Sequence, residues 1–219
     1  MKKLLLTFTI LILALLQTTA QQLYLMPKVG MTLANQITNS PFDDSYYKTG
    51  FVVGGALEYK ISELFSLQTE LLYIQKGEKD EYMFTSNDVI VGGIYDVERK
   101  RIYNYLEIPL LAKATFGKGN FKLFIFGGPS FSYLVNAKEK NLFIRKDGTG
   151  TYSSEGKKSY NLDFTNRFEV GLQSGVGVLI DGVGSGTIVA DARHGLSKFN
   201  TNTKNSVFAF TLGYRIPLN

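Results

Sequence analysis

The sequence predicts an all-β fold, an eight-stranded antiparallel up-and-down transmembrane β-barrel. Three observations indicate it. Eight segments alternate apolar residues with other residues at a period of two, and none shows a convincing helical period. Each segment is at least as long as the roughly 9–11 residues that a tilted strand needs to cross a membrane. The connections are alternately short and long, as in barrels with tight turns at one rim and long loops at the other.

The expected strands follow one another without a linker or a second domain. They are residues 23–34, 50–61, 64–76, 101–116, 121–135, 163–180, 187–198 and 206–218. The short connections are 62–63, 117–120 and 181–186, and the longer ones are 35–49, 77–100, 136–162 and 199–205. An even number of strands places both chain ends at the rim with the short turns, which is periplasmic in outer-membrane barrels.

Residues 1–20 have the three-part pattern of a secretory signal peptide. Lys2 and Lys3 precede an apolar run at 4–16, and small and polar residues lead to an expected cut after Ala20. That apolar run is shorter than the roughly 20 residues of a spanning helix. We therefore expect residues 21–219 to form the mature barrel domain, exported to the outer membrane. No cysteine occurs, so neither a disulfide nor a lipidated cysteine is expected.

The composition argues against several classes of function. Without Lys2 and Lys3, the 24 basic residues become 22 against 19 acidic residues, a net charge of +3. This charge is too weak to indicate a nucleic-acid partner. The sequence has no metal-ligand cluster and no phosphate-binding glycine loop, so we expect no metal and no cofactor. We expect the protein to be a monomer.

The alternation defines two faces, and their composition indicates which one points inward. In 64–76, for example, Phe65, Leu67 and Leu71 oppose Ser66 and Glu70. A soluble lipocalin-type barrel would turn the apolar face inward. The polar face is instead rich in glycine and in opposite charges, which suits a narrow lumen, and the apolar face is too bulky for the interior of eight strands. Aromatic residues also gather near the strand ends, as at membrane interfaces; they are Tyr59, Phe65, Phe116, Phe121, Tyr73, Tyr103, Tyr133 and Phe208. The apolar face is therefore predicted to meet lipid.

The polar faces together supply charges of both signs to the predicted lumen. Five acids and six bases are expected there: Glu58, Glu70, Glu107, Glu169 and Asp191, with Lys28, Lys60, Lys113, Arg167, Arg193 and Arg215. Unpaired charges in a narrow lumen would be costly, so we predict a structural ladder of ion pairs that fills it. A filled lumen is not a pore.

Three features depart from the regular pattern. Pro109 and Pro129 lie within expected strands, where each lacks the N–H of a ladder hydrogen bond, so local bulges are predicted. Leu111 interrupts the apolar and polar alternation. The segment 121–135 is compatible with either face pointing inward.

Several of these stretches resemble a known family. GFVVGGALEYKI, LFSLQTELLYIQKG, YLEIPLLAK, the strand with ARHGL and the closing LGYRIPL resemble the PorT-like outer-membrane β-barrel proteins of the Bacteroidetes. The resemblance spans nearly the whole mature chain, and FSLQTELLY and YLEIPLLAK are its most specific parts. It implies an eight-stranded outer-membrane barrel and no single activity, although the founding type is a secretion accessory protein. One departure is the end of the chain, which is IPLN where many such barrels end in an aromatic residue.

The single histidine raises the alternative of a lipid-modifying enzyme. His194 lies three residues before Ser197. On a strand this spacing turns the two side chains to opposite faces, so they cannot form a nucleophile and base pair. By parity His194 is expected to face lipid near the outer interface.

The two long loops carry opposite charge. Residues 77–100 hold six acids and three bases, and residues 136–162 hold six bases and three acids. The loops could dock on each other, the basic loop could meet lipopolysaccharide phosphates, or the charges could simply be solvated. We predict that 77–100 forms a hairpin extending its two strands above the membrane, and that 136–162 is mobile.

The sequence therefore favours a non-enzymatic outer-membrane protein with a side-chain-filled lumen. Such a protein would act through its extracellular loops or as an accessory of an envelope or secretion complex. Its expected partners are outer-membrane lipid, lipopolysaccharide and an envelope protein that the sequence does not identify. The alternatives are a small porin-like channel and, less favoured, a lipid-modifying enzyme.

Overall fold

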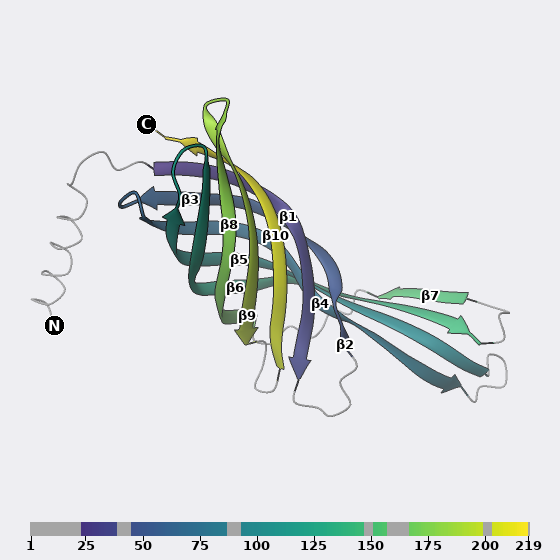
Figure 1. Ribbon diagram of the computed structural model, residues 1–219. Coiled ribbons are helices and arrows are strands. Elements are labelled where there is room, and N and C mark those ends of the chain that lie inside the picture. The colour runs from purple at the N-terminus through teal and green to yellow at the C-terminus, as the bar shows by residue number, and fades with distance from the viewer. Residues whose placement is uncertain are drawn as a thin grey trace, which may run out of the picture.

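A computed structural model describes residues 23–38, 45–86, 93–146, 151–156, 167–198 and 203–218. They form ten strands (Figure 1): β1 Leu23–Thr38, β2 Ser45–Tyr46, β3 Lys48–Lys60, β4 Phe65–Ser86, β5 Gly93–Phe116, β6 Phe121–Arg145, β7 Thr151–Gly156, β8 Phe168–Val183, β9 Gly186–Lys198 and β10 Thr203–Pro217. The predicted signal peptide, residues 1–20, lies outside the described residues. In the described ranges, no helix has the length and apolar character needed to cross a membrane.

Eight of the strands close into an antiparallel barrel. Going round the ring, β1 pairs with β3, followed by β4, β5, β6, β8 and β9, and β10 pairs again with β1. The closing ladder between β1 and β10 runs from Tyr24 opposite Pro217 to Thr38 opposite Thr203. The predicted eight-stranded barrel is confirmed. The short strands β2 and β7 lie outside the ring and pair with β4 and β6.

Three strands are much longer than the barrel requires and project from one rim (Figure 1). β4 and β5 stay paired from Gly77 opposite Ile102 to Ser86 opposite Gly93, which confirms the predicted hairpin. β6 follows β5 as far as Arg145, and β7 adds a fourth strand. The prediction that 136–162 is mobile is wrong for 136–145, because pairing with β5 holds this polar stretch as a strand. We call this projection of β4, β5, β6 and β7 the extracellular sheet, because the rim with the long loops is expected to lie outside the cell.

The two faces of the barrel wall are oriented as predicted. Large apolar side chains stand exposed on the outside, with Leu172 69% exposed, whereas polar and charged side chains point inward and are buried. Most of the predicted aromatic positions near the strand ends, such as Phe65 and Tyr133, are exposed on the outer face. Tyr103 is the exception, since it is buried inside the barrel in an apolar cluster with Tyr105 and Leu134. Tyr103 lies four positions before Glu107 on β5, so both side chains point to the same inward face and Tyr103 does not face lipid.

The lumen also contains apolar side chains. One apolar cluster lies toward the short-turn rim and includes Leu111, Phe124 and Phe126. Leu111 therefore points inward, as the backbone alternation requires. It departs from the pattern only because it is an apolar residue on the otherwise polar inner face. Phe124, Phe126, Ser130 and Ser132 are buried, which settles the inward face of the ambiguous segment as its even-numbered residues.

The expectation of bulges at the two prolines is wrong. The register between β5 and β6 is the same on both sides of Pro109, and Pro129 pairs with Leu172 in an unbroken ladder. The register instead shifts between Asn104 and Tyr105, where Val135 of β6 is left without a partner. A bulge at this point changes which residues of β6 face inward, at the level where the barrel gives way to the extracellular sheet.

Candidate functional site

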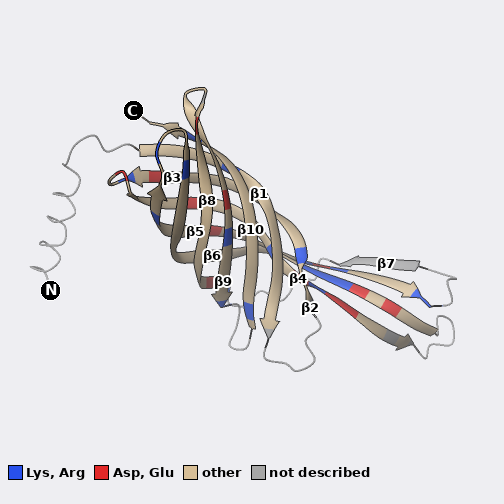
Figure 2. Ribbon diagram, in the orientation of Figure 1, with Lys and Arg blue, Asp and Glu red and all other residues tan. Residues whose placement is uncertain are grey.

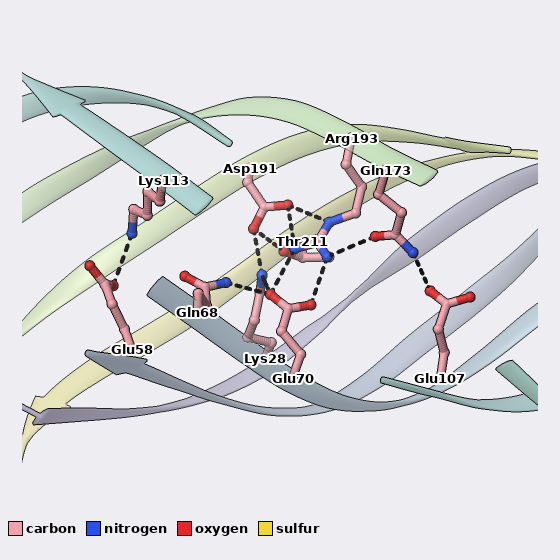
Figure 3. A network of polar contacts seen from close by, with 10 residues as sticks. All are labelled: Lys28, Glu58, Gln68, Glu70, Glu107, Lys113, Gln173, Asp191, Arg193 and Thr211. Carbon is pink, nitrogen blue, oxygen red and sulfur yellow. Dashed lines mark hydrogen bonds and ion pairs between the residues drawn. The ribbon is translucent and has the colours of Figure 1, made fainter. Parts of the chain in front are cut away.

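The middle of the lumen is held by a compact network of four charges (Figure 3). Lys28 Nζ lies 2.6 Å from Asp191 Oδ2 and 3.0 Å from Glu70 Oε1. Arg193 approaches Glu70 at 2.6 Å and Asp191 at 3.0 Å, and Thr211 donates a hydrogen bond of 2.7 Å to Asp191. The four charged side chains are almost fully buried. Each buried charge thus has two opposite charges within contact distance, which offsets its desolvation.

A second ion-paired group lies nearer the short-turn rim. Lys113 Nζ is 2.9 Å from Glu58, and Arg215 approaches the same carboxylate at 3.5 Å. Ser66 also donates a hydrogen bond to Glu58. The two cations stack on aromatic rings as well, Lys113 on Phe124 at 4.1 Å, which adds a cation–π contribution.

A third group lies toward the outer rim and centres on Lys76. Lys76 Nζ is 2.8 Å from Glu107 and 3.6 Å from Glu169. Ser132 donates to Glu107, and Ser197 donates to Glu169. Tyr105 and Asn205 also donate to Glu169, so both carboxylates have hydrogen-bond donors besides the lysine.

Gln173 connects the central and outer groups. Its amide nitrogen donates to Glu107, and its oxygen accepts from Arg193 at 3.5 Å. A cavity of about 20 Å³ beside Gln173 is lined by Lys76, Glu107 and Arg193. This is room for about one water molecule. The packing of these side chains leaves little free volume at this level of the lumen.

The structure brings nine of the eleven predicted lumen charges into ion pairs. The other two, Lys60 and Arg167, lie half-buried near opposite rims, and neither forms an ion pair within the described ranges. Lys76 was missed as a member of the ladder, although its parity with Glu70 on β4 placed it on the polar face. With Lys76 included and the two rim residues left out, five acids face five bases, and the formal charge of the lumen network is zero.

The arrangement around His194 differs from a lipid-hydrolysing site. Ser197 points into the lumen and donates to Glu169, so it lies on the opposite face from His194, as the spacing predicted. His194 Nε2 lies instead 3.0 Å from Ser206 Oγ, and its ring stacks on Phe208 with centroids 4.4 Å apart. Ser206 is buried, so its hydroxyl is not open to an ester in the membrane. The contact anchors the imidazole to the barrel wall.

The extracellular sheet carries many of the charges outside the lumen, visible along β4, β5 and β6 in Figure 2. On one face Arg101 lies between Glu78 and Glu139, which belong to the two neighbouring strands. On the same face Arg99 pairs with Asp80 at 2.6 Å. The oppositely charged long loops thus meet by strand pairing, from Tyr95 opposite Arg145 to Lys100 opposite Lys140.

On the other face the sheet presents a row of lysines. Lys79, Lys100 and Lys140 lie directly opposite one another on β4, β5 and β6. Glu98 lies in the next row, 2.6 Å from Lys100 and 3.2 Å from Lys79. The hydrogen bond from Lys100, with help from Lys79, holds the pKa of Glu98 below its usual value of 4.5. We call Lys79, Lys100 and Lys140 the lysine row.

A closed antiparallel barrel with apolar side chains outside and ion pairs inside defines an integral outer-membrane β-barrel protein. The comparison with known families agrees. Residues 19–214 match the family described as outer membrane protein beta-barrel domain, and the chain belongs to this family, which is located in the outer membrane. No curated protein matches the sequence.

Solved barrels resemble the chain in fold at low sequence identity. The attachment invasion locus protein Ail of Yersinia pestis is 12% identical, covering 90% of this chain and 100% of its own, with a TM-score of 0.42. The outer membrane protein OprG of Pseudomonas aeruginosa is 8% identical, covering 89% and 96%, with a TM-score of 0.46. The outer membrane protease OmpT of Escherichia coli is 10% identical, covering 92% and 99%, with a TM-score of 0.35.

Proposed function

We propose that the protein is a non-enzymatic outer-membrane barrel with a side-chain-filled lumen that acts through its extracellular sheet, as an accessory of an envelope or secretion complex. The observation that carries this proposal is the sheet itself. Within the ring, β4 and β5 are already joined by the pairs from Phe65 to Lys76. The pairs from Gly77 to Ser86 lie beyond the ring and are not needed to close it. Ordering these residues costs conformational entropy, and a surface for a partner gives a reason for that cost.

The more specific assignment that we propose is to the PorT-like proteins of the Bacteroidetes, exported with residues 1–20 as a signal peptide. The two most specific stretches of the resemblance, FSLQTELLY and YLEIPLLAK, contribute Glu70, Glu107 and Lys113 to the ion pairs of the lumen. The charged residues in these two stretches therefore have a structural role in the barrel. Because the founding type of that family is a secretion accessory protein, the resemblance also supports an accessory role.

One corner of the extracellular sheet exposes apolar side chains beside the ion pair of Asp96 and Lys146, and it supports a protein partner. Met83, Asp96 and Ile144 form one cross-strand row, and Ile94 follows on the same face. Met83 is 68% exposed, and Ile94 and Ile144 are nearly half exposed. Apolar side chains that gather on one face of a projecting sheet are a common mark of an interaction surface.

The lysine row supports a contact with lipopolysaccharide. Lys79 lies three residues beyond Lys76, roughly 10 Å along the strand at about 3.3 Å per residue, and so close above the outer rim. Three lysines directly opposite one another repel, and Glu81 and Glu98 offset part of their charge. The phosphates of the outer leaflet would offset more of it. Reversing the charge of Lys100 and Lys140 to glutamate should weaken binding of purified lipopolysaccharide at least tenfold, while Lys60→Glu with Lys118→Glu at the other rim should not.

Photo-cross-linking in intact cells tests the proposal. A photoreactive amino acid at position 83 should yield an adduct with one envelope protein. The same residue at position 82, where Tyr82 points to the opposite face of β4, is the matched control and should not yield it. In a further variant, the photoreactive residue stands at position 144 and Met83 is changed to Glu. This change should abolish the adduct. The absence of any protein adduct from positions 83 and 144 would overturn the proposal.

A further inference from the structure

We propose that the periplasmic mouth of the barrel is a binding site for a small multivalent anion, a polycarboxylate or a phosphate compound. A cavity of about 290 Å³ opens at this rim between the β3–β4 turn at 61–64 and the β5–β6 turn at 117–120. This volume lies near the lower end of the range for small-molecule pockets. The inference is independent of the proposed function, which concerns the opposite rim.

The charged lining of the mouth is mainly basic. Four bases and two acids line the cavity: Lys60, Lys118, Lys122 and Arg215, with Glu58 and Glu63. Glu58 is already engaged from inside the lumen by Lys113 at 2.9 Å, and Lys122 is paired with Asp181 at 2.6 Å. With these two partners included, five bases stand against three acids. A concave site with an excess of one sign of charge raises the local concentration of the opposite ion.

Arg215 is the buried cation of the mouth, and its contacts with the protein are long. Its side chain is 10% exposed, and its closest protein contacts are 3.4 Å to Thr187 Oγ1 and 3.5 Å to Glu58. Asp181 lies further away at 3.8 Å. Nitrogen to oxygen hydrogen bonds are normally 2.7–3.2 Å, so none of these contacts is a close one.

One nitrogen of Arg215 has no hydrogen-bond partner among the described residues. Its Nε is buried and makes no hydrogen bond in the described structure. Leaving a buried donor of a charged group unsatisfied is costly. The face of the guanidinium lies against the ring of Tyr24, 4.3 Å from its centre. An oxyanion at the terminal nitrogens of the guanidinium would receive donors that the protein itself satisfies poorly.

Lys60 and Lys118 supply the further positive charges that favour a multivalent ligand. Both line the cavity, and neither makes an ion pair with any residue that the structure describes. Arg215 would bind one oxyanion group in the depth of the mouth, and the two lysines would meet a second group nearer the rim. A monovalent anion could satisfy only one of these positions.

The test titrates the mature protein in lipid nanodiscs with inorganic pyrophosphate and with citrate, at constant ionic strength. Amide chemical shifts of Gly117, Gly119 and the 61–64 turn report binding at the mouth. We expect saturable binding of one or both anions, at least tenfold tighter than acetate. Pyrophosphate binding alone assigns a phosphate ligand, and citrate binding alone assigns a polycarboxylate.

Two pairs of variants make the result specific. Lys60→Gln with Lys118→Gln removes two charges from the mouth without breaking an ion pair, and it should lower the affinity at least tenfold. Lys138→Gln with Lys146→Gln removes two charges from the extracellular sheet and should leave the affinity unchanged. Arg215→Lys keeps the charge but lacks the paired donors, and it should also weaken binding. The inference is overturned if neither anion saturates, or if both double variants weaken binding equally.

Discussion

Lys76 and Glu107 form an ion pair of 2.8 Å inside the barrel, and each side chain is only 2% exposed. The lysine comes from β4 and the glutamate from β5, in a part of the wall where the outer faces of both strands meet hydrocarbon. Glu169 of β8 completes the group at 3.6 Å. The group joins the neighbouring strands β4 and β5 to β8 across the lumen and makes the interior a packed core.

Removal of Lys76 should destabilise the barrel strongly. Lys76→Met leaves Glu107 and Glu169 buried without a cation, and breaking a buried ion pair in this way costs about 3–5 kcal/mol. Urea unfolding of the protein from lipid vesicles measures the loss. Lys76→Met combined with Glu107→Gln should be less destabilised than Lys76→Met alone, since Ser132 and Gln173 can still bond to the amide. A double variant as unstable as the sum of both changes would argue against coupling.

The lipid-facing assignment predicts a strong effect of charge on the outer wall. Leu212 of β10 is 59% exposed and lies midway between Phe208 and Ile216. Leu212→Arg should lower the free energy of unfolding in bilayers by about 2–4 kcal/mol, the cost of arginine near the membrane centre. Leu212→Ala provides the control for lost apolar area. If arginine were tolerated as well as alanine at this position, the wall would not face hydrocarbon there.

Two adjacent glycines of β3 should respond differently to the same change. A Cβ added at Gly54 would lie 2.1 Å from the Leu71 carbonyl oxygen, whereas one added at Gly55 would have Met26 O as its nearest neighbour at 3.9 Å. Gly54→Ala must therefore push β4 away, at a cost of about 1–3 kcal/mol. Gly55→Ala should stay within about 0.5 kcal/mol of the parent. Equal stabilities in the same unfolding assay would contradict the close strand approach.

The extracellular sheet should loosen in acid. Because its bond from Lys100 lowers the pKa of Glu98 in the folded state, Glu98 contributes stability above pH 4.5. That contribution is lost as the pH falls through the lowered value. Hydrogen exchange of the β5 amides at 94–100 should accelerate over this range, and Glu98→Gln should remove part of the pH dependence. An unchanged profile in the variant would show that Glu98 is not the titrating group.

The period-two pattern was sufficient to predict the ring of strands and the inward face of most of them. Glu107, Lys113 and Leu106 illustrate why: parity along one strand decides which solvent a side chain meets, and this information is local. The same alternation places Lys76 on the inward face of β4. Matching each predicted lumen acid with a base could have identified Lys76 as a member of the network. The excess of bases in the predicted set arose from Lys60 and Arg167, which the rims leave partly solvated.

What the sequence did not reveal depends on neighbouring strands. The stretch 136–145 is too polar to look like a strand, and it becomes one because β5 offers a continuous partner. The shift at Asn104 and Tyr105 arises where the barrel wall gives way to the extracellular sheet, so no single residue marks it. The pair of His194 and Ser206 lies across two strands in a register that one segment cannot specify.

Single-channel recording of the purified protein in planar bilayers tests the central claim most directly. Packed side chains leave room for about one water molecule between Lys76 and Arg193, and we propose that they close the lumen. The account predicts no steady conductance for the parent protein at neutral pH. Reproducible openings of the folded protein, abolished by bulky substitutions at Ser130 or Gly195 beside the cavity, would contradict it.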